Sequence, residues 1–227
     1  MRYTRLTGML SLVAAMGLGT ACFADIAIDV TPGVPPLTLS PTGQTTQGWE
    51  FVANRPITVT HLGLYDAPNS GGSEGDGFFL EHPIGLWRQG GSLLASVTLP
   101  SGTGADTELL DGFRYLDVPD VSLAQGERYI VGFYTGPYTW PAPADEMWVW
   151  LQYFTWSADP AIEYVSGLWG AGTGLALPST PTTVANGLYR FGPNFQFTDT
   201  VVPVPGAALL GILGLSCAGW RLRRRTR

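Results

Sequence analysis

Apolar and polar residues alternate with a period of two in several short segments of the chain. This spacing places successive side chains on opposite faces of a β-strand. Gly- and Pro-rich stretches separate the segments, and no window shows a sustained period of 3.6 residues. The expected strands cover residues 25–30, 47–53, 57–65, 83–89, 92–99, 112–118, 127–135, 147–154 and 187–198.

Details of this pattern give further expectations for the fold. In the segment 57–65, the alternation places Ile57, Val59 and His61 on one face of the strand. Residues 119–126 are predicted to form a turn-rich connection, and 160–168 leave room for one short helical turn. Many short strands with Gly and Pro in the turns predict an all-β fold, an antiparallel β-sandwich of jelly-roll-like type.

The end of the chain has a different pattern, without any charged residue from position 201 to 220. Twenty residues at about 1.5 Å each would span roughly 30 Å as a helix, close to the hydrocarbon thickness of a bilayer. A buried core helix would also be apolar, but here an arginine cluster without a nearby acidic partner follows, which favours a transmembrane helix with a cytoplasmic end. The cluster is Arg221, Arg223, Arg224, Arg225 and Arg227.

The beginning of the chain has the layout of a secretory signal peptide. Arg2 and Arg5 precede an apolar stretch at 6–19, and small residues follow up to Ala24. Cleavage after Ala24 or Ala21 would leave a mature domain that starts near Asp25. The predicted organisation is a signal peptide at 1–24, one extracytoplasmic domain at 25–200 and a C-terminal signal at 201–227.

Charge and cysteine content narrow the function of the domain at 25–200. It contains all 18 acidic residues of the chain and only five arginines, which gives a formal charge of −13, and the chain has no lysine. Nucleic acids and anionic lipid surfaces require basic patches, so we expect neither as a partner. Cys22 and Cys217 both lie outside the domain. A disulfide, a thiolate metal site and a cysteine nucleophile are therefore excluded within it.

The C-terminal segment resembles the PEP-CTERM sorting signal of Gram-negative bacteria, which combines a Pro-containing motif, a membrane helix and terminal arginines. The motif position is filled by Val202, Pro203, Val204, Pro205 and Gly206, with Val204 where the family usually has Glu. The resemblance implies processing by an exosortase, a membrane protease of transpeptidase type. It also implies delivery from the inner membrane to the cell surface or its exopolysaccharide matrix.

A second resemblance concerns the domain itself. The segments 48–51, 57–66, 83–87, 112–115, 123–129 and 191–197 are similar to a secreted β-sandwich family of the DUF4082 type. These motifs are strand and turn signatures, so the resemblance implies a fold rather than a chemistry.

An acidic, Gly-rich segment at 66–81 offers oxygen ligands of the kind that Ca²⁺ prefers. The candidate ligands are Asp66, Asn69, Glu74 and Asp76. A solvated loop with acidic residues for solubility explains the same composition. The sequence predicts no other cofactor.

Aromatic residues crowd the last third of the domain, and flat rings of this kind stack on sugar faces. The candidate platform for a carbohydrate consists of Trp140, Trp148, Trp150 and Trp156. If these rings are buried, they belong to the core instead.

Together these patterns predict an exported structural or interaction protein of the cell surface or extracellular matrix. A carbohydrate-binding module is the alternative. A hydrolase would need two carboxylates or a Ser/His pair in a cleft, and the Gly-x-Ser-x-Gly motif around Ser73 lacks the required strand and helix. We therefore expect no catalysis.

Overall fold

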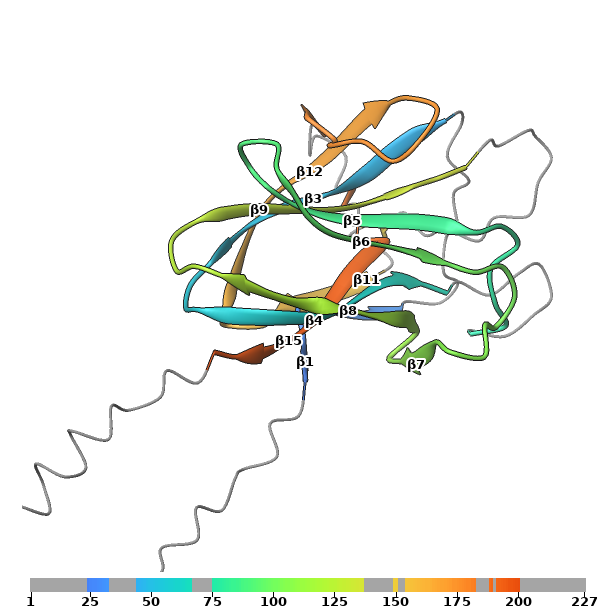
Figure 1. Cartoon of the computed structure of the whole chain (residues 1–227), viewed down its shortest axis with the longest axis horizontal. Coiled ribbons are helices and arrows are strands. Elements are labelled where there is room, and N and C mark those ends of the chain that lie inside the picture. The colour runs from blue at the N-terminus through green and yellow to red at the C-terminus, as the bar shows by residue number, and fades with distance from the viewer. Residues whose placement is uncertain are drawn as a thin grey trace, which may run out of the picture.

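The computed structural model describes residues 24–32, 44–66, 75–136, 149–150, 154–182, 188–189 and 191–200. The regular elements assigned within these ranges are strands, and all of their pairings are antiparallel. The predicted all-β, antiparallel class is therefore confirmed. Two larger sheets lie one above the other in a sandwich-like arrangement (Figure 1).

The strands belong to two larger sheets and two small ones. The five-stranded sheet has the order β1 (Asp25–Ile26), β15 (Pro193–Asp199), β4 (Ile57–Tyr65), β8 (Phe113–Leu123) and β7 (Glu108–Leu110). The six-stranded sheet has the order β13 (Thr180–Pro181), β12 (Ile162–Ala171), β3 (Thr45–Ala53), β9 (Arg128–Tyr134), β5 (His82–Arg88) and β6 (Leu93–Leu99). The small pairs are β2 (Ile28–Pro32) with β11 (Phe154–Ala158), and β10 (Val149–Trp150) with β14 (Leu188–Tyr189).

Aromatic rings join the two larger sheets at the centre of the core. Trp49 and Phe51 of β3 meet Phe195 of β15, with ring centroids 5.9 Å and 4.9 Å from that of Phe195. All three side chains are fully buried. The Trp49 Nε1–H donates a hydrogen bond to the Pro193 carbonyl at 2.7 Å, so the polar atom of the indole is satisfied. Such ring pairs add about 0.5–1.5 kcal/mol to the free energy gained from burial.

A second apolar cluster covers part of the six-stranded sheet. Trp87, Ile130 and Leu168 pack together, and Leu175 and Leu177 from the segment after β12 close over them. The central strand β9 is consequently buried along six of its seven residues, 129–134. Burial on both faces explains why its sequence does not alternate.

The predicted strand at 57–65 exists, but its predicted faces are wrong. The register of β4 with β8 shifts between Val59 and His61. Opposite Thr60, β8 carries the three residues 118–120. On the other side of β4, Val59 and His61 face the consecutive residues Phe197 and Gln196 of β15, so Thr60 is an extra residue there. This bulge resets the alternation, so Leu62 and Leu64 are the buried aliphatic residues after it, while His61 is half-buried.

Two predictions about connections are also wrong. Residues 119–123 continue β8 instead of forming a turn. Pro119 is tolerated there because it lies in the bulge, where its missing N–H breaks no ladder bond. The predicted helical turn within 160–168 is strand β12, which pairs with β3. In that case a partner strand overrides a weak local preference.

Candidate functional site

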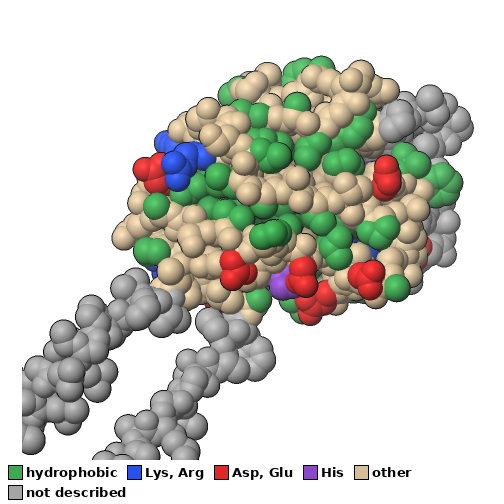
Figure 2. Space-filling view, in the orientation of Figure 1, with side chains coloured by type: hydrophobic (Ala, Val, Ile, Leu, Met, Phe, Trp, Pro, Cys, Tyr) green, Lys and Arg blue, Asp and Glu red, His purple; other side chains and the backbone are tan. Residues whose placement is uncertain are grey.

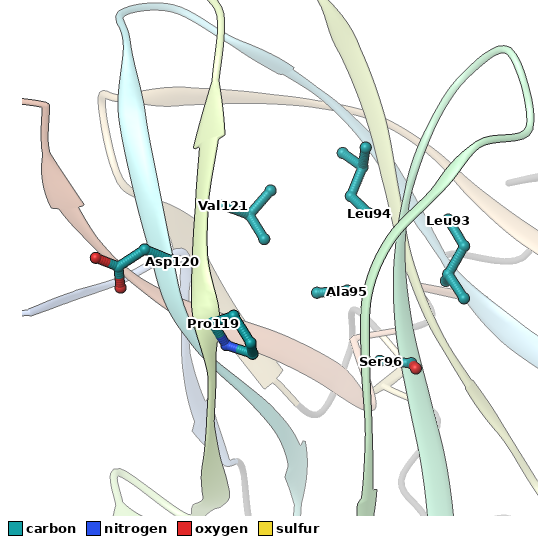
Figure 3. Close-up of a pocket in the computed structure, with 7 residues that line it drawn as sticks. All are labelled: Leu93, Leu94, Ala95, Ser96, Pro119, Asp120 and Val121. Carbon is teal, nitrogen blue, oxygen red and sulfur yellow. The ribbon is translucent and has the colours of Figure 1, made fainter.

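An open groove of about 340 Å³ lies between β6 and β8 on one side of the sandwich (Figure 3). Apolar side chains supply most of its walls, and none of its residues is basic. Val121 points from β8 toward β6, whereas the Asp120 carboxylate points away from the groove (Figure 3). The lining residues are Leu93, Leu94, Ala95 and Ser96 of β6, and Pro119, Asp120 and Val121 of β8.

The groove exists because two sheet edges lie next to each other without pairing. β6 is the last strand of its sheet. On the other side, β7 pairs only with residues 113–115 of β8, so the rest of β8 is an edge within the described part of the chain. Bulges interrupt both edges, one where β5 meets β6 and one at 118–120 of β8. Bulges increase local twist and thereby separate edges that would otherwise approach.

The face around the groove is apolar in its middle and acidic at its lower border (Figure 2). Leu93, the first residue of β6, lines the groove and is 52% exposed. Exposed apolar surface bordered by polar residues is typical of interaction sites. The groove is therefore the best candidate for a binding site among the described residues.

The predicted calcium ligands are only partly described. Asp66 and Asp76 lie in the described residues, while Asn69 and Glu74 lie outside them, as does Ser73. Among the residues that the structure describes, no three His, Cys, Asp or Glu side chains are placed to hold a metal ion. The calcium site thus stays a prediction.

The Asp66 carboxylate is already engaged within the protein. Its Oδ2 accepts hydrogen bonds from Nε and Nη2 of Arg114 at 2.8 Å and 2.6 Å, and its Oδ1 accepts one from the Gly77 N–H at 3.1 Å. Arg114 also donates to the carbonyls of Thr103 and Gly75. Burial raises the pKa of Asp66, and the hydrogen bond and charge of Arg114 oppose this rise. Arg114 thus supplies the positive charge that the predicted cation would bring.

The predicted carbohydrate platform is described only at Trp156. Trp140 and Trp148 lie outside the described residues, and Trp150 is described as part of β10 without its side chain. The half-buried Trp156 packs against Tyr164 and Phe191, with centroid separations of 5.4 Å and 4.8 Å. Its ring therefore contributes to the core.

Trp156 also borders a second, smaller hollow of about 210 Å³. The other lining residues are Asp29 and Thr31 of β2, and Thr155 and Ser157 of β11. These four are exposed, and they carry one carboxylate and three hydroxyls. Such groups exchange hydrogen bonds with hydroxylated ligands.

A short chain of polar contacts lies on the five-stranded sheet. His61 Nε2 is 2.6 Å from Asp117 Oδ1, and its Nδ1 is 2.8 Å from Thr60 Oγ1. The bulge brings the hydroxyl and the imidazole together, since it interrupts the alternation between Thr60 and His61. Asp117 is 86% exposed, and neither of the two hollows is lined by these residues. In the described part of the chain, neither hollow gives these residues the enclosed substrate position that a hydrolytic triad needs.

Sequence reasoning missed the groove residues. One signal was present, because residues 93–99 form a strand without charge, Gly or Pro. The other wall, at 119–121, falls in the segment 119–126 that the sequence predicts to be a turn-rich connection.

The sorting motif at 202–206 and the arginine cluster from Arg221 to Arg227 lie outside the described residues, as do most of the predicted signal peptide and the predicted membrane helix. Within the described ranges, no helix has the length and apolar character needed to cross a membrane. No protein-family model matches the chain, and a search of curated proteins found no significant match.

Proposed function

We propose that this chain is an exported surface protein with a binding or structural role and no catalytic activity. The observation that carries the proposal is the groove between β6 and β8, whose apolar walls suit recognition rather than bond cleavage. The buried carboxylate of Asp66 supports this reading, because it is neutralised by Arg114 within the protein. Thr60, His61 and Asp117 are in contact with one another, and none of them lines either hollow.

We further propose that the C-terminal segment directs this protein to the surface. The motif at Val202 to Gly206, the apolar stretch and the terminal arginines support sorting by an exosortase. In this proposal the chain is held transiently in the inner membrane, and the processed domain then joins the cell surface or the exopolysaccharide matrix. The β-sandwich of DUF4082 type and the jelly-roll topology belong to the same proposal.

Localisation and mass of the protein in its own host test the sorting proposal. The full chain is compared with a chain truncated after Thr200. We expect the full chain to reach the outer surface without either end segment, and the truncated chain to fail to do so. A full-length protein retained in the inner membrane would refute processing by an exosortase.

Carbohydrate binding is the second candidate function, and the hollow beside Trp156 favours it. Its hydroxyls and carboxylate suit the hydroxyl groups of a sugar. Asp29→Ala and Thr155→Ala remove polar groups at exposed positions without touching the packed indole. If the hollow binds sugar, both variants weaken binding to the host's exopolysaccharide in a pull-down assay. Equal binding by wild type and both variants would exclude this hollow as the sugar site.

A further inference from the structure

We propose that the groove between β6 and β8 accepts an extended, apolar peptide segment from a partner protein, which adds to β6 as an extra strand. This inference rests on the proposed binding role and names the chemistry of the partner. The segment would carry uncharged side chains toward the groove and basic residues at its ends.

The backbone of β6 provides the first reason. Its pairing with β5 satisfies one side of the strand, and no described strand pairs with the other side. An edge strand of this kind offers a row of unpaired N–H and C=O groups to an incoming strand.

The sequence of β6 provides the second reason. Proteins usually protect exposed edges with charged residues, Pro or bulges. β6 has the sequence LLASVTL, without charge or Pro, and its bulge at Leu94 leaves residues 95–99 in regular register with β5. β8 carries Pro119 and Asp120 together with the bulge at 118–120, so its edge is protected. The guest strand is therefore expected to bond to β6, while its side chains cover Val121 on the opposite wall.

The negative charge of the domain provides the third reason, and it favours a partner with basic residues over a second copy of this chain. The domain at 25–200 has a formal charge of −13, and Asp117 and Asp120 are exposed on β8 near the groove. A second copy of this chain would bring the same negative charge to the contact. Partly screened repulsion would oppose that contact, whereas a segment with basic ends would be attracted.

The test uses a fluorescein-labelled peptide in which three alternating Thr-Val pairs are flanked by one Lys at each end. Fluorescence anisotropy measures its binding to the full chain in a mild detergent. A matched peptide with Pro in place of the central Val lacks a backbone N–H, so we expect it to bind about tenfold more weakly.

Variants on neighbouring positions of β8 locate the site. Val121 points into the groove, whereas Ser122 is exposed and does not line it. Val121→Lys should reduce affinity for the first peptide by about tenfold or more, since it places a charge in an apolar groove. Ser122→Lys should leave the affinity within about twofold of wild type.

A second variant, Leu93→Lys, is included in case Val121→Lys does not fold. Leu93 is already half exposed, so a lysine there should not disturb the core. It should also weaken binding while the thermal unfolding curve stays unchanged. Absence of saturable binding, equal binding of the Pro peptide, or equal effects of Val121→Lys and Ser122→Lys would overturn the proposal. A wild-type dimer in sedimentation velocity that Val121→Lys dissociates would show that a second copy occupies the groove instead.

Discussion

Arg114 reaches Asp66 diagonally across two neighbouring strands. The register partner of Arg114 on β4 is Leu64, two residues before Asp66. Both charged side chains are almost fully buried, and the guanidinium also binds the carbonyls of Thr103 and Gly75. One side chain thereby fixes the end of β4, the residues before β5 and the segment that follows β6.

Breaking this ion pair should strongly destabilise the protein. Asp66→Asn or Arg114→Met leaves one buried charge without its partner, and we expect a loss of about 3–5 kcal/mol in the free energy of unfolding. Urea denaturation provides the measurement. Arg55→Met is the matched control, because Arg55 pairs with Asp199 at an exposed position, where the expected loss is about 0–1 kcal/mol. Equal losses for the buried and exposed pairs would contradict the assigned role.

Acid should destabilise the protein through His82. Burial lowers the pKa of this imidazole from 6.5 to about 4, although its Nδ1 hydrogen bond to the Tyr134 carbonyl opposes the change. The unfolded chain takes up the proton first, so the stability present above pH 6.5 is lost as the pH falls from about 6.5 to 4. The expected loss is about 3 kcal/mol, since one pKa unit corresponds to about 1.4 kcal/mol.

To isolate this effect, the free energy of unfolding of wild type, His82→Phe and His61→Gln is measured by chemical denaturation at several pH values. The variant should lose the decline between pH 6.5 and about 4, whereas His61→Gln should keep it. The raised pKa of Asp66 acts in the opposite direction, since it favours the folded state as pH falls. Asp66 is present in all three proteins, so its contribution cancels to first order. The same decline in His82→Phe would refute the assignment.

Gly63 should not tolerate a side chain. A Cβ at this position would collide with the ring of Tyr115, its register partner on β8, which is fully buried. Gly63→Ala should therefore cost about 1–3 kcal/mol through overpacking, visible as a lower Tm. Gly90→Ala is the control, because a Cβ added at Gly90 would meet no atom within 4 Å. Similar Tm values for both variants would show that the Tyr115 ring moves aside freely.

The indole N–H of Trp49 should contribute separately from its ring. Trp49→Phe keeps an aromatic ring against Phe195 but removes the donor that satisfies the Pro193 carbonyl. We expect a loss of about 2 kcal/mol or more, from the missing hydrogen bond and the smaller ring. Trp169→Phe, at a 37% exposed position, should change the free energy of unfolding by less than about 1 kcal/mol. A Trp49→Phe variant as stable as Trp169→Phe would disprove the role of the hydrogen bond.

The sequence was a good guide to strand positions and a poor guide to strand faces. Alternation located β3, β4, β5 and β6 because each has a run of suitable residues between turns. It failed at His61, since a bulge depends on the partner strand and has no local signature. The short strand β7 was missed for a similar reason, because three residues acquire strand geometry only beside β8.

The candidate groove could not be predicted because it is a relation between two sheets. The apolar run at 93–99 indicated a strand but not its position at an edge. Pro119 indicated a turn, and only pairing with β4 shows that the strand continues past it. The aromatic residues left a sugar platform and the core as alternatives, and at Trp156 the ring packs against the core.

The pairing of β1 with β15 has a mechanical consequence. Asp25 lies opposite Phe197, so the chain enters and leaves the domain at adjacent points of one sheet edge (Figure 1). If the C-terminal end were tethered, the rest of the domain would extend away from the attachment point on one side. Tension between the two ends would peel the two-residue strand β1 away first. Tension on the C-terminal end alone would instead load β15, which is bonded to β4 along its length and anchored by the rings of Phe195 and Phe197.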